Sequence, residues 1–173
     1  MDRDILRQFY RRYSREIYLY LYSLCKSRET AEDLMQEVFL KALLSLPDQN
    51  ENLRAWLYKV ARNACFNELR NRKREVEMDP AAEADVYAAE AVEKKQDSLS
   101  DILIRNEQKK MLSEAMLKLP DRQREILELF YFSEMSMKQI AEIMKLTPQN
   151  VRVLAYRAKK QLREYMEVKE YEL

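Results

Sequence analysis

The sequence predicts an all-α protein made of two small helical domains joined by a flexible linker. Three observations lead to this fold class. The 173 residues include no glycine and four prolines, so tight hairpins, which favour glycine at positive φ, would have to turn on Asn and Asp alone. Apolar residues recur every three or four positions, as they do on the buried face of a helix. Charge is also segregated into two basic ends and an acidic middle.

The composition excludes most common enzyme chemistries. At the usual frequency of about 7%, a chain of this length would carry about twelve glycines. Their absence excludes glycine-rich phosphate loops and dinucleotide fingerprints. The absence of histidine excludes histidine general bases, Ser-His-Asp triads and HExxH zinc sites. We therefore expect no enzymatic activity, no cofactor, no metal and no small-molecule substrate.

The cysteines and the apolar runs indicate the compartment. Cys25 and Cys65 are too few for a cysteine-only zinc site or a disulfide framework, and we expect both to be buried apolar side chains on helices. The chain has no apolar run of about 18 residues. Its charged first residues are not followed by a signal-type segment. These features predict a soluble, cytoplasmic protein.

The net charge of +1 conceals three segments of different charge. Residues 1–74 carry 15 basic and 10 acidic side chains, residues 75–101 carry 2 and 9, and residues 102–173 carry 14 and 11. The middle segment is also rich in alanine and short of large apolar residues, so it can bury little surface. We therefore predict domains at 1–74 and 102–173, with an acidic linker between them.

Three amphipathic helices with short connections are predicted in the N-terminal domain. The first spans about residues 5–24. The second is expected to begin near Thr30, whose spacing to Asp33 resembles a capping box, and to end before Pro47. The third follows Asn52, a favourable N-cap residue. Together they predict a small helical bundle.

The C-terminal domain carries the pattern of a helix-turn-helix. Ser136 and Gln139 have the spacing of a capping box that opens a short helix. Residues 145–146 then form a turn. Thr147 caps a longer helix with Pro148 at its first position, where the missing N–H is harmless. A short helix, a tight turn and a long helix make up this motif.

The long helix carries charge of one sign. Residues 145–163 include six basic side chains and no acidic one. Such a face beside a helix-turn-helix is typical of a surface that binds the DNA phosphate backbone, although a solvated basic face is the alternative. Gln149 and Asn150 have amides that can pair with adenine in the major groove, or they are simply good N-terminal helix residues.

A second basic run closes the N-terminal domain. Six lysines and arginines between residues 59 and 74 lie close in sequence to Trp56, Tyr58 and Phe66, a pattern that suits single-stranded or melted nucleic acid. We expect Trp56 and Phe66 to belong to the core rather than to a stacking surface. Asn63 and Asn67 lie one turn apart and either read a base edge or are only exposed to solvent.

Acidic and apolar residues lie close together between residues 33 and 40. A helix that buries one stripe and presents Leu34, Phe39 and carboxylates on another is typical of a protein interface. An ordinary amphipathic helix is the alternative.

Three motifs, in this order, resemble those of the bacterial extracytoplasmic-function (ECF) sigma factors, the two-domain minimal type. AEDLMQEVFLKAL at 31–43 is similar to the helix that binds core RNA polymerase. NLRAWLYKVARNACFNELR at 52–70 is similar to the segment that recognises the promoter −10 element. The sequence from 119 to 163 is similar to the helix-turn-helix that reads the −35 element. The resemblance implies a sigma2-type bundle at 1–74 and a sigma4-type domain at 102–173.

The resemblance also implies roles for three groups of residues. Docking on the coiled coil of the polymerase β′ clamp is implied for Asp33, Leu34, Gln36, Glu37 and Phe39. Recognition of the −10 element is implied for Trp56, Tyr58, Arg62, Asn63, Asn67 and Arg70. Recognition of the −35 element is implied for Gln149, Asn150, Arg152, Val153, Tyr156, Arg157, Lys159 and Lys160.

The function implied is that of an initiation factor, which binds core RNA polymerase at the β′ clamp and β flap, directs it to promoter DNA and melts the −10 region. An anti-sigma factor commonly holds members of this family inactive. The acidic linker is expected either to thread through the polymerase's nucleic-acid channels or to be a solvated tether. One departure from the family is the turn at 46–50, where an aromatic residue and a glycine are often found.

One alternative function is a free-standing, dimeric helix-turn-helix regulator. Such a dimer would bind palindromic DNA without polymerase. A sigma factor should instead need core enzyme and use two unlike promoter elements.

Overall fold

The computed structural model describes residues 3–45, 52–78 and 107–172, and within these ranges the ordered elements are all helices. The chain divides into two compact units, Met1–Lys95 and Gln96–Leu173, which are taken in turn. In the same ranges, none of the helices has the length and apolar character needed to cross a lipid bilayer. The predicted all-α fold is confirmed.

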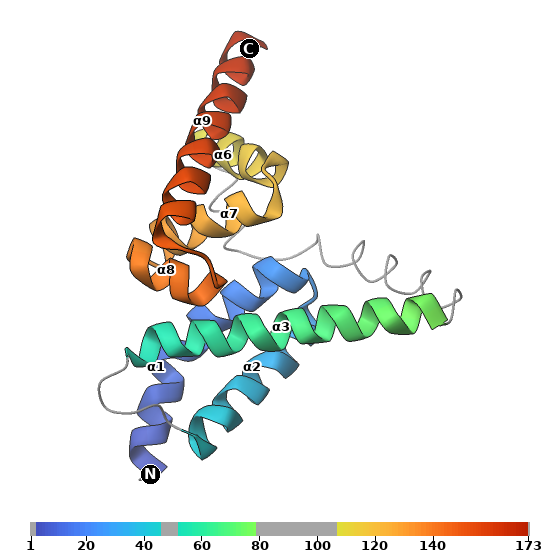
Figure 1. Ribbon diagram of the computed structural model, residues 1–173, viewed down its shortest axis with the longest axis vertical. Helices are drawn as coiled ribbons and strands as arrows, with labels where there is room; N and C mark the ends of the chain where they lie inside the picture. The colour runs from blue at the N-terminus through green and yellow to red at the C-terminus, as the bar shows by residue number, and fades with distance from the viewer. Residues whose placement is uncertain (1–2, 46–51, 79–106, 173) are drawn as a thin grey trace. The chain divides into compact units, whose positions relative to one another are not determined.

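The described part of the first unit is a bundle of three helices that all pack against one another. Helix α1 (Arg3–Cys25) and helix α2 (Arg28–Leu44) run antiparallel, and helix α3 (Leu53–Met78) crosses both of them (Figure 1). Their shared core is aliphatic at its centre. Side chains with no exposed surface include Ile17, Leu21, Val38, Leu57, Ala61 and Cys65.

Local hydrogen bonds determine where α2 and α3 begin. The prediction that Thr30 caps α2 is wrong, because the N-cap is Ser27, whose Oγ accepts a hydrogen bond from the Thr30 N–H at 3.3 Å. The prediction for Asn52 is confirmed: its Oδ1 accepts hydrogen bonds from the N–H groups of Arg54 and Ala55 at 3.1 and 3.3 Å. The expected stop at Pro47 lies outside the described residues.

Helix α3 continues past the predicted domain boundary at residue 74. It ends at Met78, so Glu75 and Glu77, which were expected to belong to the linker, lie on its last turns. The physical reason is the run of Arg, Lys and Glu, which are good helix formers, with no helix-breaking residue before Pro80. The rest of the predicted linker lies outside the described residues.

The second unit is built around one long helix. Helix α9 (Pro148–Glu172) contacts α6 (Glu107–Lys118), α7 (Asp121–Leu127) and α8 (Met137–Met144), as Figure 1 shows. The core lies on the inner face of α9. It includes Leu119, Ile126, Leu127, Leu129, Ile140, Val151, Ala155 and Ala158.

The caps of the helix-turn-helix are those that the sequence predicts. The Gln139 N–H donates to Ser136 Oγ at 3.1 Å, and the Ser136 N–H donates to Gln139 Oε1 at 2.9 Å. Lys145, in the turn between α8 and α9, takes the left-handed conformation with φ of 55°. Thr147 Oγ1 accepts a hydrogen bond from the Asn150 N–H at 3.2 Å. The predicted helix-turn-helix is therefore confirmed.

One local feature has no signal in the sequence. The helix expected to run through Ile126 and Tyr131 widens into a π-helical turn, η3 (Glu128–Phe132), closed by a bond from the Ser133 N–H to the Glu128 oxygen at 3.1 Å. The wider turn keeps Leu129 buried and leaves Tyr131 and Phe132 exposed, Tyr131 at 56%.

Candidate nucleic-acid and protein-binding surfaces

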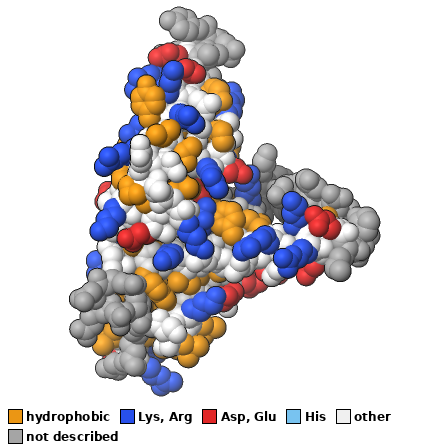
Figure 2. All heavy atoms as spheres, in the orientation of Figure 1, with side chains coloured by type: hydrophobic (Ala, Val, Ile, Leu, Met, Phe, Trp, Pro, Cys, Tyr) orange, Lys and Arg blue, Asp and Glu red, His pale blue; other side chains and the backbone are white. Residues whose placement is uncertain are grey.

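One face of α9 is exposed over its first four turns. Val151, Ala155 and Ala158 point into the core, so the residues between them point outward. Tyr156 is 69% and Val153 is 43% exposed. The same side presents Gln149, Asn150, Arg152, Arg157, Lys160 and Arg163, all of them exposed. Lys and Arg side chains are spread along α9 in the view of Figure 2.

Lys159 lies at the edge of this face rather than on it. Its Nζ is 5.1 Å from the centroid of the Phe130 ring and 5.5 Å from that of Tyr131. These distances are within the range of cation–π attraction. Eight residues are expected to contact the −35 element. Among them, Lys159 is therefore the one whose side chain contacts the aromatic rings of the η3 turn.

Helix α3 presents amides and cations on one solvent-facing side. Asn63, Asn67 and Arg70 follow one another at helical spacing, and Arg70 Nη2 donates a hydrogen bond to Asn67 Oδ1 at 2.6 Å. Asn67 and Arg70 are exposed, while Asn63 is half-buried. The structure thus brings three of the predicted −10 residues together. Lys and Arg side chains also gather over α3 in Figure 2.

Phe66 belongs to this outer side and not to the core. Its side chain is 36% exposed, and the guanidinium of Arg62 lies 4.3 Å from the centroid of its ring. The prediction of a core role for Phe66 is wrong, because the inner face of α3 is already occupied by smaller residues, Ala61 and Cys65. Trp56, expected in the core as well, is half-buried.

Tyr58 faces the opposite way and is 1% exposed. Its ring packs against Tyr20 with centroids 4.9 Å apart, and its hydroxyl donates to Glu16 Oε2 at 3.0 Å. The structure corrects the assignment of Tyr58 to the DNA surface, because a ring enclosed between α1 and α3 cannot reach a nucleic acid.

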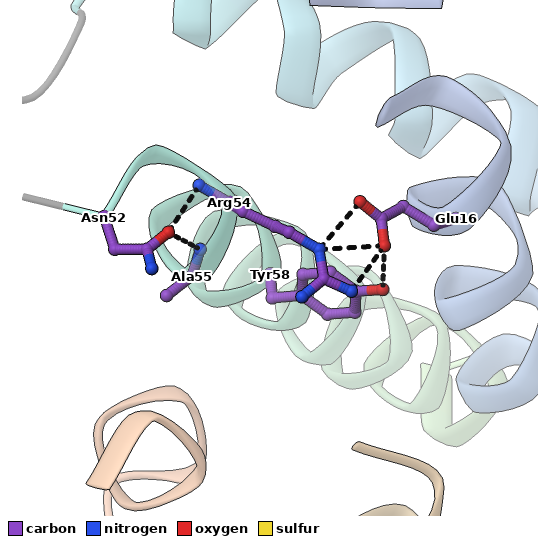
Figure 3. Close-up of polar contacts among 5 residues, drawn as sticks. All are labelled: Glu16, Asn52, Arg54, Ala55 and Tyr58. Carbon is purple, nitrogen blue, oxygen red and sulfur yellow. Dashed lines mark hydrogen bonds and ion pairs between the residues drawn. The ribbon is translucent and has the colours of Figure 1, made fainter. Parts of the chain in front are cut away.

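Glu16 also binds Arg54, as Figure 3 shows. Arg54 Nε lies 3.0 and 3.1 Å from the two carboxylate oxygens, and Arg54 Nη2 donates to Oε2 at 2.8 Å. The hydrogen bonds that Arg54 donates to Glu16 raise the pKa of Arg54. This ion pair and the Asn52 cap hold the first turn of α3 on α1, which positions the outer side of α3.

On α2 the structure separates the predicted docking residues into two groups. Asp33, Gln36 and Glu37 are exposed, and Glu37 pairs with Lys41 at 3.0 Å. Leu34 and Phe39 are only 4% and 6% exposed. The expectation that these two apolar side chains are displayed on the surface is wrong, because both pack inward between the helices.

The apolar part of this surface comes from leucines that sequence reasoning missed. Leu40, Leu43 and Leu44 are 59%, 42% and 81% exposed. Leu40 and Leu43 line an open groove of about 460 Å³ between α1 and α2. Its lining is Leu6, Arg7, Tyr10, Arg11, Gln36, Phe39, Leu40 and Leu43. The sequence did contain a signal for these exposed leucines. The apolar residues after Phe39 are spread around too much of the helix to fit on one buried stripe.

The same two segments of the chain match described protein families. Residues 9–75 match sigma-70 region 2, and residues 109–162 match sigma-70 region 4. The first match covers α2 and most of α1 and α3, and the second covers the helix-turn-helix.

Relatives match over nearly the full length. The RNA polymerase sigma factor YlaC of Bacillus subtilis is 30% identical over 170 residues, which are 95% of this chain and 93% of the relative. The ECF RNA polymerase sigma factor SigM of the same organism is 29% identical over 157 residues, covering 90% and 91%.

A solved structure has the same fold. The sigma factor RpoE of Bartonella quintana, solved with the anti-sigma factor NepR, aligns with a TM-score of 0.68 at 23% identity, covering 94% of this chain and 96% of that one. Together with the helix-turn-helix and the matched regions, these findings confirm the resemblance read from the sequence and do not favour a free-standing dimeric regulator. The chain belongs to the ECF sigma factors of the sigma-70 family, promoter-specific initiation factors that bind core RNA polymerase.

Proposed function

We propose that this sigma factor divides its work among three surfaces: α2 docks on the β′ clamp, the outer side of α3 binds the −10 element, and α9 binds the −35 element. The observation that carries the proposal is the exposed face of α9. It combines one-sign charge with a helix-turn-helix, and its side chains are exposed in the described part of the chain. Such a face is suited to the phosphate backbone of duplex DNA.

On α9 the cations and the central residues have different tasks. The cations attract the phosphates and so position the helix on the duplex without recognising its base sequence. They are Arg152, Arg157, Lys160 and Arg163. Val153 and Tyr156 lie at the centre of the face and offer apolar surface, which suits a thymine methyl group. We therefore expect few positions of α9 to determine its preference for a DNA sequence, and many positions to contribute to its affinity for DNA.

The outer side of α3 suits a melted strand better than a duplex. An exposed aromatic ring, Phe66, lies beside the amides of Asn63 and Asn67, and unpaired bases can stack on such a ring while amides contact their edges. Arg62 and Arg70 add positive charge for the backbone. This combination supports recognition and melting of the −10 region, with a base turned out of the stack.

The α2 surface has the composition of a protein interface. Exposed carboxylates lie next to exposed leucines, and a groove opens beside them. Leucines supply apolar area, while carboxylates select a basic partner. We infer that Asp33, Gln36 and Glu37 face the β′ clamp and that Leu40 contributes contact area, with Leu34 and Phe39 supporting the surface from below.

Three further assignments complete the proposal. The chain works in the cytoplasm, where its polymerase is, and leaves catalysis to that enzyme. The second domain also contacts the β flap. An anti-sigma factor covers the polymerase-binding surface in the inactive state; the RpoE and CnrH structures that share the fold were each solved with a regulator bound, NepR and the cytosolic domain of CnrY.

The proposal is tested with purified protein and core RNA polymerase. We expect a stable complex by pull-down, and run-off transcripts from its own promoters that require this protein and are absent when another sigma factor replaces it. Genome-wide mapping of transcription starts after overexpression identifies those promoters. If the protein instead forms a dimer that binds palindromic DNA and captures no polymerase, the free-standing regulator is the correct function.

A further inference from the structure

An open depression between α1 and the start of α3 is lined mainly by arginines. Its volume is about 400 Å³, and its wall includes the Glu16–Arg54 ion pair drawn in Figure 3. Three guanidinium groups and one carboxylate border this space. The full lining is Arg12, Tyr13, Arg15, Glu16, Leu19 and Arg54. None of these residues belongs to the sets expected to bind the −10 element, the −35 element or the β′ clamp, so the depression is a further surface of the first unit.

The carboxylate of the depression is already engaged. Glu16 accepts hydrogen bonds from Arg54 Nη2 at 2.8 Å and from the Tyr58 hydroxyl at 3.0 Å. Arg12 lies four residues before Glu16, a spacing at which Arg and Glu commonly pair on a helix. In the described part of the chain this pair does not form, and the Arg12 guanidinium instead lies 5.5 Å from the centroid of the Tyr13 ring. Arg12 therefore loses its expected partner to Arg54.

Arg15 has no acidic neighbour within one turn of α1. Arg12 and Arg11 lie three and four positions before it, and Tyr18 and Leu19 follow at the same distances. Both Arg12 and Arg15 are exposed, and neither forms an ion pair with a residue of the described ranges. Like charges at these spacings destabilise a helix. A bound anion would offset that repulsion.

The residue type and the shape of the depression suit a phosphate group on a chain. Guanidinium groups bind phosphate through two parallel hydrogen bonds, a geometry that lysine cannot supply. The depression is open and its two uncompensated cations are exposed, so a polymer can lie across it. Arg54 belongs to the first turn of α3, and a DNA strand that lies along the outer side of α3 passes this end of the helix.

An acidic protein segment suits the depression less well. Protein interfaces contain an apolar centre that excludes water. In this depression the aliphatic lining is one exposed leucine, Leu19, whereas the groove on the α2 side of α1 is lined by several leucines and aromatic rings. The first unit therefore has an apolar groove suited to a protein and, separately, an arginine-lined depression suited to a nucleic-acid backbone.

We propose that Arg12 and Arg15 bind phosphate groups of the promoter strand that flanks the −10 element. Arg54, held and partly neutralised by Glu16, forms the fixed wall of this phosphate site. The contacts are to the backbone, so they add affinity for DNA without preference for a base sequence. The inference rests on the proposed role of α3, because the strand reaches the depression from the outer side of that helix.

The test measures promoter binding by holoenzyme that is assembled from the full-length protein and core RNA polymerase. Fluorescence anisotropy with a promoter fragment at several salt concentrations gives the slope of log K against log salt. Arg12→Gln/Arg15→Gln should reduce the size of this slope by about 1.5 units, since each phosphate contact contributes roughly 0.7–0.9. Affinity should fall by the same factor for a fragment with an altered −10 element. Arg12→Lys/Arg15→Lys keeps the charges and should keep most of the slope.

The matched control removes two exposed cations elsewhere on the first unit. Arg3→Gln/Lys26→Gln makes the same charge change at the two ends of α1, outside the depression, and should leave the slope unchanged. An equal fall in this control would assign the effect to net charge and overturn the site. An unchanged slope in Arg12→Gln/Arg15→Gln would also overturn it. Melts followed by circular dichroism verify folding, and the single variants, each with half the change in slope, replace a double variant that is unfolded.

Two further measurements separate this site from its rivals. Pull-down with core polymerase should not distinguish Arg12→Gln/Arg15→Gln from wild type, and a loss of core binding with an unchanged DNA slope would mean that polymerase covers these arginines. Asn67→Ala tests α3 by itself. If it loses discrimination against an altered −10 element while the arginine variant keeps its slope, the phosphate site is wrong and the role of α3 stands. If it keeps discrimination while the arginine variant loses slope, only the role of α3 is contradicted.

Discussion

Glu16 and Arg54 join the first and third helices by a two-pronged ion pair, although they are 38 residues apart in sequence. Arg54 Nε and Nη2 approach the carboxylate at 3.0 and 2.8 Å, and both side chains are about 30% exposed. Tyr58 donates to the same carboxylate from the buried side. One acidic residue therefore serves two partners on α3, and its removal should affect both.

Replacing Glu16 with Ala should destabilise the protein. The change removes the acceptor of the buried Tyr58 hydroxyl and of the hydrogen bonds that Arg54 donates to Glu16, so the free energy of unfolding should fall by about 1–3 kcal/mol. Urea denaturation measures it. The matched control is Glu32→Ala, which removes an exposed pair with Arg28 and should cost about 0.5 kcal/mol or less. Equal losses in the two variants would contradict the special role of Glu16.

Replacing Lys145 with Gly should stabilise the protein. Lys145 ends α8 with φ of 55°, a conformation in which a Cβ atom is unfavourable. The strain energy that is relieved exceeds the entropic cost of adding a glycine to the unfolded chain. We therefore expect the free energy of unfolding, measured by urea denaturation, to rise by about 0.5–1 kcal/mol. Lys145→Ala removes the charge but keeps the Cβ and should not gain. A gain in both variants would attribute the effect to charge instead.

Reversing the charge of Glu37 should weaken binding to core polymerase. Glu37 is exposed on α2, and a lysine there would repel a basic partner surface. Pull-down or surface plasmon resonance with core enzyme should show at least about a tenfold loss of affinity, or about 1.4 kcal/mol. Glu32→Lys makes the same charge change on the same helix, outside the predicted docking set, and should bind nearly as wild type. If both variants bind equally well, α2 is not the docking helix at this position.

Removing Arg157 should lower promoter affinity and flatten its dependence on salt. A side chain that neutralises one phosphate adds about one unit to the slope of log K against log salt. Fluorescence anisotropy with a promoter fragment and holoenzyme, at several salt concentrations, measures this slope. Lys110→Ala removes an exposed cation of α6 in the same unit and should leave it unchanged.

Lys159→Ala should have a smaller effect on the salt slope than Arg157→Ala. The Lys159 ammonium lies over the rings of Phe130 and Tyr131, so only part of its charge is available to a phosphate. The same anisotropy titration compares the two variants. A larger change in slope for Lys159→Ala would mean that the ammonium leaves the rings when DNA binds.

Alkylation of Cys25 should follow a thiolate titration near neutral pH. The pKa of Cys25 is lowered to about 7, chiefly by the hydrogen bond from Cys65, so the rate with iodoacetamide should be half-maximal near that pH and rise above it. Mass spectrometry of the modified peptide identifies the site. A midpoint at about 8.5, that of an ordinary cysteine, would contradict the lowered value.

Much of the fold was predictable because it is encoded locally. The N-cap at Asn52 and the capping box at Ser136 and Gln139 join groups within four residues of each other, so residue types and spacing determine them. The wrong prediction that Thr30 caps α2 has a local cause too, because Ser27 lies three residues earlier and is an equally good N-cap residue.

The candidate surfaces were only partly predictable. Helical spacing placed Asn63, Asn67 and the cations of α9 on common faces, and exposure agrees. It could not tell Tyr58, which is enclosed, from Phe66, which is exposed, because both are large aromatics on the same helix. Nor could it show that Leu40 and Leu44 lie outside the core, since an apolar run on a helix does not state which of its sides is covered.

The sequence by itself determined that this chain is helical, that its charge is divided into basic ends and an acidic middle, and that its motifs are those of a sigma factor. Those properties follow from composition and from patterns that lie within single continuous segments of the chain. Only the tertiary structure decided that Glu16 binds Arg54 and that Arg72 binds Thr30. Such contacts depend on how helices cross, and the crossing is set by the packing of the whole core rather than by any one segment.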